Sequence, residues 1–396
     1  MQQPANETTY LDFNATTPCD PRVVAAMLPF FTERFANPSS RTHDPGRQAF
    51  AALESARREV ASTLGAGAPS EVIFTSGATE ANNLAIAGVA EAASGRRRGL
   101  VTQATEHAAV LRVMTALAKR GWDLTVVGVN RDGTIDLDEL TAAISPDTAL
   151  VSLMLANNET GAMQPVAEAA DLAHAHGAVL HCDAAQAIGK VPVELQSLGA
   201  DLVSISGHKI YGPKGVGALW VRRRRPPLRI EPLLRGGGQE HGLRAGTLNL
   251  PGVVGLARAC TLAGEALASG EPARLAALRD RLEKGILAAL DGVAVNAGSV
   301  ARLPNTCNLA FSGVDGHALM ASLPDLAVSS GSACTSARPE PSHVLLAMGL
   351  PKRLAAASLR FSIGRPTRRE DIERAIQRVA EEVTRLRAGA GKPYSG

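Results

Sequence analysis

The feature that most constrains the fold is a regular alternation of short apolar runs and amphipathic segments through the first two thirds of the chain. We expect strands at residues 71–75, 99–103, 124–129, 148–155, 178–182, 202–206 and 216–221. Residues 79–93, 110–120 and 166–176 lie between these runs and have helical spacing. Such alternation favours an α/β fold with a mostly parallel sheet that helices cover on both faces. Ligands then bind beyond the carboxyl ends of the strands.

The last third of the chain has a different organisation. A long helical stretch over residues 253–290 interrupts the alternation, and shorter strands and helices follow. The chain closes with an amphipathic helix near residues 369–386. This change predicts a second, smaller domain of α+β type.

Composition excludes several classes of function. The chain of 396 residues has 41 basic and 38 acidic side chains, a net charge of +3 that gives no general reason to expect nucleic acid. We interpret the basic run at residues 222–225 as a solvated loop. No apolar stretch reaches the roughly 20 residues of a membrane span, and the first residues lack a secretory pattern, so we expect a cytoplasmic protein. Five scattered cysteines without a CxxC pair predict neither disulfides nor a resident metal site.

Two residues at neighbouring strand ends suggest the chemistry. Lys209 follows a buried strand inside the glycine-rich segment DLVSISGHKIYGPKG, and Asp183 ends the strand AVLHC. Pyridoxal phosphate (PLP) needs a lysine that forms a Schiff base with its aldehyde and a carboxylate that keeps its pyridine nitrogen protonated. Lys209 alone fits a surface lysine equally well; the pair of residues favours a PLP site.

Further polar residues lie at the same predicted edge. Gly77, Ala78 and Thr79 form a small-residue turn between a strand and a helix, which suits either a phosphate or an ordinary helix cap. His107 follows another strand, where an imidazole can stack on a flat ring and exchange protons, although a lone histidine is often structural. Three more candidates for hydrogen bonds to the cofactor are close in sequence: Gln186, Ser206 and His208.

Cys334 differs from the other cysteines in its surroundings. It lies in SSGSACTSARPEPS, a run of small residues and prolines that is typical of an exposed loop, whereas Cys182 lies in an apolar strand. A thiolate on such a loop can act as a nucleophile and then deliver what it has bound.

Together these segments resemble a known enzyme family. The chain is similar to the cysteine desulfurases of the NifS/IscS type, which are class V, fold-type I PLP-dependent transferases. The matching segments lie in family order from Tyr10 to Arg365: YLDFNATTP, FANPSSRTH, FTSGATEANNLAI, TEHAAV, NNETG, SGHKIYGPKGVGALW, GGGQEHGLRAGT, SSGSACTSA and SLRFSIGR.

The resemblance implies a role for each matched residue. Lys209 would carry the cofactor, Asp183 would bind its pyridine nitrogen and His107 would cover its ring. The other implied cofactor-binding residues are Ala78, Thr79, Asn158, Gln186, Ser206, His208 and Thr247. Asn37 and Arg360 would bind the substrate carboxylate, a role that suits the paired donors of a guanidinium. Asn158, beside the phenolic oxygen of the cofactor, would also contact the substrate. Thr247 would reach the phosphate in a neighbouring subunit, which implies a homodimer.

The resemblance also implies a division of the chain and a reaction. A large PLP-binding domain would span residues 15–262, and a small domain residues 1–14 and 263–396, with the cysteine loop at about 326–342. L-Cysteine would become L-alanine while Cys334, the catalytic nucleophile beside Lys209 and His107, keeps the sulfur as a persulfide. A sulfur-acceptor or iron–sulfur scaffold protein would then take it, and Cys334 could share a cluster with that acceptor. The alternatives are another class V enzyme, such as an aminotransferase or selenocysteine lyase, and a non-catalytic scaffold or sulfur carrier.

Overall fold

The structure is a computed structural model that describes residues 8–330 and 341–390. Within these residues the central sheet has the strand order β2 (Val72–Thr75), β8 (Gly217–Val221), β7 (Leu202–Ser206), β6 (Val179–Asp183), β5 (Thr148–Met154), β3 (Gly99–Gln103) and β4 (Asp123–Val127). The pairs from β7 to β4 are parallel, whereas β8 is antiparallel to both of its neighbours. The mostly parallel sheet expected from the sequence is therefore confirmed.

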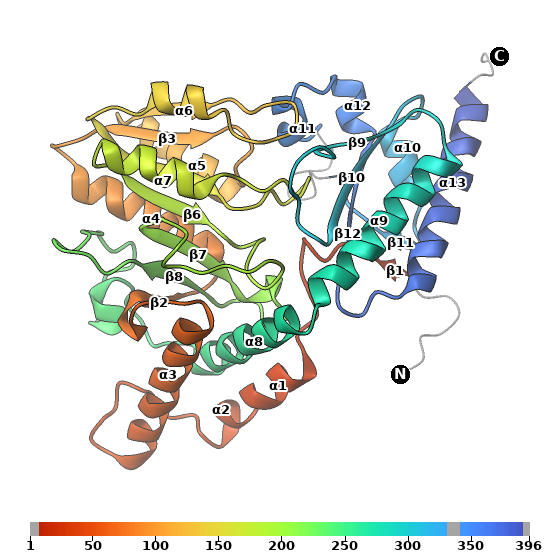
Figure 1. The fold of residues 1–396 in the computed structure, drawn as a ribbon. Coiled ribbons are helices and arrows are strands. Elements are labelled where there is room, and N and C mark those ends of the chain that lie inside the picture. Colours follow the sequence, from red (N-terminus) through yellow and green to blue (C-terminus); the bar gives the residue numbers. More distant parts are fainter. Residues whose placement is uncertain (1–7, 331–340, 391–396) are drawn as a thin grey trace.

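Successive side chains of the sheet enter two different cores. In β5, Leu150 packs with α4 (Ala78–Ala93) and α5 (Ala108–Ala118), while Val151 and Leu153 belong to the core on the opposite face. That second core includes residues of α3 (Asp44–Thr63), α7 (Val166–Ala175) and α8 (Leu250–Ala268). Side chains alternate along a strand, so a strand that is apolar throughout must be covered on both faces. Figure 1 shows this layered arrangement.

The remaining elements build the second part of the molecule. Its antiparallel sheet has the order β12 (Ser358–Ser362), β10 (Thr306–Phe311) and β9 (Val293–Val295), and β1 (Thr9–Tyr10) pairs in parallel with β11 (Leu326–Ala327). The helices beside these strands are α9 (Glu271–Ala289), α10 (Gly316–Ala321), α11 (His343–Ala347), α12 (Lys352–Ala356) and α13 (Arg369–Ala390). A separate core that includes Leu11, Phe311, Phe361 and Val379 holds this part together. The domain boundaries themselves stay a prediction.

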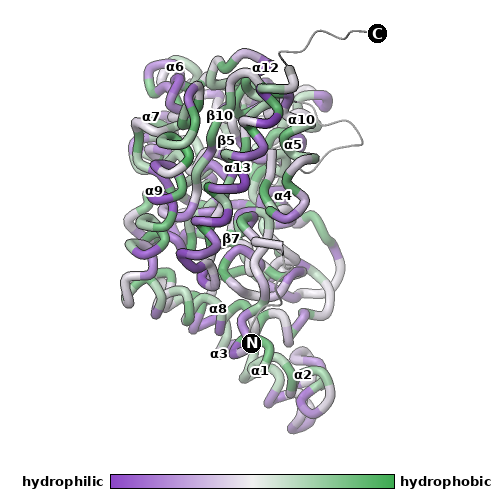
Figure 2. Tube along the Cα trace, turned by 90° about the vertical axis from the view of Figure 1, so that its right-hand side faces the viewer, coloured by the Kyte–Doolittle hydropathy of each residue, from purple (hydrophilic) through white to green (hydrophobic). Residues whose placement is uncertain are grey.

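Shorter elements complete the chain. The remaining helices are α1 (Pro21–Met27), α2 (Pro29–Thr32) and α6 (Leu137–Ala143), and the 3₁₀ turns are η1 (Pro69–Glu71), η2 (Gly207–Lys209) and η3 (Gln239–Gly242). Figures 1 and 2 both place α1 and α2 at the lower end of the molecule.

The helical stretch expected over residues 253–290 is two helices. α8 ends at Ala268 and α9 begins at Glu271, because Gly270 adopts a left-handed conformation (φ 83°) and Pro272, the second residue of α9, favours a helix start. By length and hydropathy α8 is the one helix in the described ranges that could cross a membrane, yet its apolar window is 56% buried inside the fold. That burial is typical of the core helix of a soluble protein.

Candidate functional site

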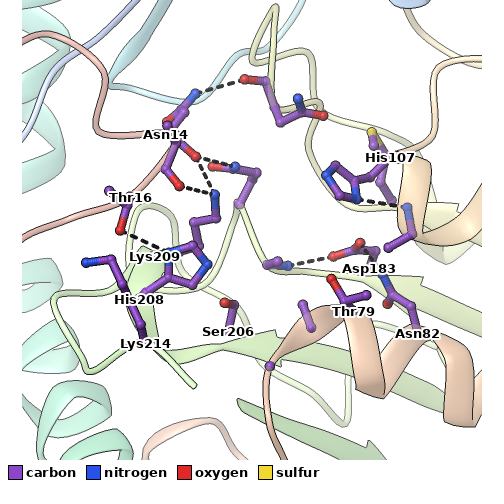
Figure 3. A pocket seen from close by; sticks show the side chains of 18 of the residues that line it. Asn14, Thr16, Thr79, Asn82, His107, Asp183, Ser206, His208, Lys209 and Lys214 are labelled. Atoms are coloured by element: carbon purple, nitrogen blue, oxygen red, sulfur yellow. Dashed lines mark hydrogen bonds between the residues drawn. The ribbon is translucent and has the colours of Figure 1, made fainter. Parts of the chain in front are cut away.

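A cavity of about 590 Å³ opens at the carboxyl ends of the central parallel strands. Its lining brings together most of the residues singled out in the sequence, namely Ala78, Thr79, His107, Asn158, Asp183, Gln186, Ser206, His208, Lys209 and Arg360. Figure 3 shows Lys209 on one side of the cavity and His107 with Asp183 on the other. The volume is in the usual range for small-molecule sites.

One wall of the cavity is the start of α4. Gly77 caps the helix with φ 150° and ψ 178°, and within residues 8–330 and 341–390 no side chain accepts a hydrogen bond from the first-turn N–H groups. Those N–H groups carry partial positive charge and lie beside Thr79 in the cavity lining. A Cβ on Gly217, at the start of β8, would come within 2.7 Å of the Gly77 Cα, so glycine is needed there for the two segments to approach. This wall suits an anion such as a phosphate.

Lys209 ends the short η2 turn that follows β7. Its Nζ donates hydrogen bonds to the main-chain oxygens of Asn14 (2.5 Å) and Ala15 (2.8 Å). Asn14 and Ala15 belong to the segment after β1, which was not among the expected cavity residues. An amine held by two carbonyl oxygens inside a cavity can bond to a carbonyl carbon and can also carry a proton.

Asp183 is the last residue of β6 and is 7% exposed. Its carboxylate accepts hydrogen bonds from the Asn82 side chain (2.7 Å) and from the Ala185 N–H (3.0 Å). Asn82 lies on α4 and is fully buried. One signal of its role was present in the sequence, a polar residue on an otherwise apolar helix face. These contacts fix the orientation of the Asp183 carboxylate in the cavity wall, where a protonated ring nitrogen would find an acceptor.

His107 caps α5, and its Nδ1 accepts a hydrogen bond from the Ala109 N–H at 3.1 Å. The proton of the neutral ring must therefore lie on Nε2. Burial lowers the pKa of His107, against the opposing effect of the Asp183 carboxylate. A neutral imidazole at neutral pH can stack on an aromatic ring and accept or donate a proton.

Glu106 lies directly before His107 and is fully buried. One of its carboxyl oxygens accepts from the Met154 N–H (2.5 Å) and from the Gln103 side chain (3.1 Å). Burial raises the pKa of Glu106 well above its usual value. Glu106 therefore holds the strand ends beside His107 in place.

Two further strand-end residues line the same wall as Lys209. Ser206 ends β7, and His208 pairs through Nδ1 with the Thr16 hydroxyl at 3.1 Å. Burial lowers the pKa of His208 to about 4, and the positive charges of Lys209 and Lys214 act in the same direction. The imidazole is therefore neutral at neutral pH.

Arg360 projects from β12 to the rim of the cavity and joins the two parts of the molecule. Its guanidinium donates to the Asn158 main-chain oxygen (2.9 Å) and to the Asp12 carboxylate (2.6 Å). The Nε–H of Arg360 is buried and has no hydrogen-bond partner among the described residues. The Arg360 guanidinium lines the cavity, and its positive charge suits a carboxylate bound there.

Three of the expected site residues are not in this lining. Asn37 and Thr247 are exposed and lie outside the cavity of their own chain. Cys334 lies outside the described residues. The roles of all three stay predictions.

The residues present fit PLP. The uncapped start of α4 suits its phosphate, Asp183 suits its ring nitrogen and Lys209 suits its aldehyde. Arg360, which lines the same cavity, suits the carboxylate of an amino acid.

Comparison with known proteins identifies the family. Residues 9–375 match the family described as Aminotransferase class-V. The chain is 49% identical over 378 residues to a cysteine desulfurase IscS of Anaeromyxobacter dehalogenans, which covers 96% of this chain and 93% of that protein.

Comparison with solved structures supports the same family. A NifS-like protein superposes with a TM-score of 0.88 at 37% identity, covering 96% of this chain and 100% of that one. SspA in complex with cysteine gives a TM-score of 0.78 at 36% identity, over 89% and 98% of the two chains. The chain belongs to the class-V aminotransferase family and, within it, to the cysteine desulfurases.

Proposed function

We propose that the protein converts L-cysteine to L-alanine with PLP as cofactor and passes the sulfur to Cys334 as a persulfide. The observation that carries the proposal is the meeting of Lys209, Asp183, His107 and Arg360 around one cavity beside the uncapped start of α4. The similarity to SspA, which was solved in complex with cysteine, supports L-cysteine as the substrate class.

Bound PLP supplies an aldehyde that bonds to amino groups and a protonated pyridine ring that withdraws electrons from the α-carbon of an amino acid. Asp183 keeps the ring nitrogen protonated. Arg360 binds the substrate carboxylate and so fixes the amino acid in one orientation. The free amine of Lys209 would take the α-proton, and the Asn14 and Ala15 main-chain oxygens would accept hydrogen bonds from the resulting ammonium.

The sulfur step balances without an external oxidant. The Cys334 thiolate attacks the sulfur of L-cysteine, so that an S–S bond forms and the C–S bond breaks with its electron pair left on carbon. That carbon takes up a proton, which the Nε2 of His107 can supply, Lys209 returns the α-proton to the α-carbon, and L-alanine leaves. A thiol reductant or an acceptor protein, for iron–sulfur assembly or another sulfur-containing product, then removes the sulfur from Cys334.

A second copy of the chain is the partner that the surface supports. Large apolar side chains between α1 and α2, on α2 and just after it are exposed, with Leu28 at 58%, Phe31 at 59% and Phe35 at 75%. Exposed apolar patches of this kind mark protein–protein contacts. Thr247 is also exposed, as a residue that serves a neighbouring site must be. Light scattering of unaltered protein and Phe31→Glu tests the dimer, which the variant should weaken.

We place the protein in the cytoplasm, where thiols stay reduced; Cys19, Cys182, Cys260 and Cys307 are all free.

The test is to incubate purified protein with PLP, L-cysteine and a thiol reductant and to quantify alanine and sulfide together. Equal amounts of both products are expected from the unaltered protein. Lys209→Ala and Cys334→Ser should each form neither above background, and Cys19→Ser, a partly buried thiol away from the cavity lining, should match the unaltered protein. Yellow, folded protein that forms no alanine from L-cysteine would contradict the proposal and point to another amino-acid substrate.

A further inference from the structure

A second lysine, Lys190, lies behind the cavity lining and contacts two of its residues, Asn14 and Gln186. It follows Gln186 by four residues and is 8% exposed. Its Nζ donates hydrogen bonds to the Gln186 Oε1 at 2.6 Å and to the Asn14 Oδ1 at 2.8 Å. Both acceptors are amide oxygens, so this buried amine has uncharged hydrogen-bond partners in the described part of the chain.

These two bonds fix the direction of a cavity side chain. An amide has an oxygen end that accepts and a nitrogen end that donates. Because Lys190 binds the Gln186 Oε1, the Nε2 is turned to the other side, where it donates to the Asn14 main-chain oxygen at 3.0 Å. Gln186 itself lines the cavity. Lys190 thus adds to the preference for this orientation that the bond to the Asn14 main-chain oxygen already gives.

Asn14 connects Lys190 and Gln186 with Lys209. The Asn14 main-chain oxygen that accepts from Gln186 also accepts from the Lys209 Nζ. The Asn14 side chain is held by Lys190 and by Asn305, whose Nδ2 donates to the Oδ1 at 3.1 Å. Lys190 and Lys209 therefore bind two atoms of the same residue, one on its side chain and one on its backbone.

A buried amine in these surroundings carries an energetic cost. Burial lowers the pKa of Lys190 well below its usual value, and the positive charges of Lys209 and Arg360 lower it further. A methionine of similar length would pack there without that cost. A polar group that is kept in spite of such a penalty next to an active site points to a role in the site.

We propose that Lys190 is a positioning residue of the cofactor site, which acts on Lys209 and on the bound cofactor through Gln186 and Asn14. This inference rests on the proposed function, because it assumes that the cavity binds PLP. Lys190 keeps the N–H end of Gln186 directed toward Asn14 and keeps the Asn14 carbonyl oxygen in place to receive the Lys209 amine.

The test is an equilibrium titration of the apoprotein with PLP, in which absorbance measures the bound cofactor. It compares the unaltered protein with Lys190→Met, Gln186→Met and the double variant. Loss of one hydrogen bond to a charged or oriented group should weaken binding about tenfold in each single variant. If Lys190 acts through Gln186, the double variant should bind no more weakly than the weaker single variant, because residues in one network are not additive.

Two further variants separate positioning from a general effect on folding. Lys190→Gln keeps an N–H donor for both amide oxygens and should restore most of the affinity, and the exposed-site control Lys119→Met should bind as tightly as the unaltered protein. Thermal melting of each apoprotein shows that it is folded.

The outcomes are distinguishable. If the unaltered protein fails to bind PLP, the proposed function fails and the inference fails with it. If the unaltered protein binds but Lys190→Met binds equally tightly, or if the losses in the double variant add, the inference alone is wrong. Failure of Lys190→Gln to recover affinity would also overturn it.

Discussion

The buried ion pair of Arg57 and Glu240 should contribute strongly to the stability of the fold beside β2, the strand that precedes Gly77 and the start of α4. The Arg57 guanidinium donates to both carboxyl oxygens of Glu240, at 2.8 and 2.6 Å, and the two side chains are 5% and 1% exposed. Arg57 also donates to the Val72 main-chain oxygen, and Glu240 accepts from the Phe74 N–H, both at 2.6 Å. The pair thus completes the hydrogen bonds on the open edge of β2, the strand that leads into Gly77.

Glu240→Ala would remove the carboxylate that binds two nitrogens of the buried Arg57 guanidinium, which would keep only its 3.2 Å contact to the partly exposed Glu54, and would leave the buried Phe74 N–H without its acceptor. Breaking a buried ion pair by removing one partner costs about 3–5 kcal/mol, and the unsatisfied Phe74 N–H adds to that cost. A loss of about 4 kcal/mol corresponds to a fall in melting temperature of roughly 10 °C for a large domain.

Thermal melting of the apoprotein measures this effect. Glu231→Ala is the matched control, because Glu231 pairs with Arg235 at 3.9 Å on the surface, where the side chains are 51% and 73% exposed. Exposed pairs contribute about 0.5 kcal/mol, so the control should melt within about 2 °C of the unaltered protein. The double variant Arg57→Met, Glu240→Met should recover part of the stability, because it leaves no unpaired charge. If Glu240→Ala melts like Glu231→Ala, the reasoning is refuted.

Three further predictions concern pH, substrate and packing. Burial lowers the pKa of His181 to about 4; the unfolded chain binds the proton more tightly, so the free energy of unfolding should fall by about 3 kcal/mol from this group as the pH drops from 6.5 to 4. Urea unfolding at pH 7 and pH 4.5 should show a weaker pH dependence in His181→Gln, and an unchanged dependence would contradict the assignment. Arg360→Lys loses the paired donors and should raise the KM for L-cysteine at least about tenfold with PLP still bound; steady-state kinetics with an unchanged KM would exclude Arg360 as the carboxylate ligand. Gly217→Ala would place a Cβ 2.4 Å from the Ile205 main-chain oxygen and should weaken PLP binding, whereas Gly238→Ala, which meets no heavy atom within 4 Å, should not; equal PLP affinities in a binding titration would count against the close approach.

The features that could be predicted from the sequence are those that depend on neighbouring residues along the chain. The strands ending at Asp183 and Ser206 are continuous apolar runs followed by polar or glycine-rich residues, so both their existence and their ends were readable. Because parallel strands end at one edge, the meeting of Asp183 and Lys209 in one cavity also followed. The break at Gly270 also had a local signal, a glycine followed by Glu271 and Pro272. It was missed because the helical spacing of apolar residues continues on both sides, which favoured one long helix.

Contacts between distant segments could not be predicted in this way. Asn14 meets Lys190 and Lys209, which follow it by 176 and 195 residues, and no periodicity relates them. A lysine at position 190 reads as a surface residue, because lysine is rarely buried. Only the folded chain shows that the segment after β1 passes beneath the cavity and supplies its carbonyl oxygens.

The central claim is that sulfur leaves L-cysteine for Cys334 at a site where Lys209 holds the cofactor. The most direct measurement is peptide mass spectrometry of the PLP-loaded protein after exposure to L-cysteine without reductant. The account predicts one added sulfur atom on the peptide that contains Cys334, and none in Lys209→Ala. Sulfur released while Cys334 stays unmodified, or sulfur found instead on Cys19, would contradict it.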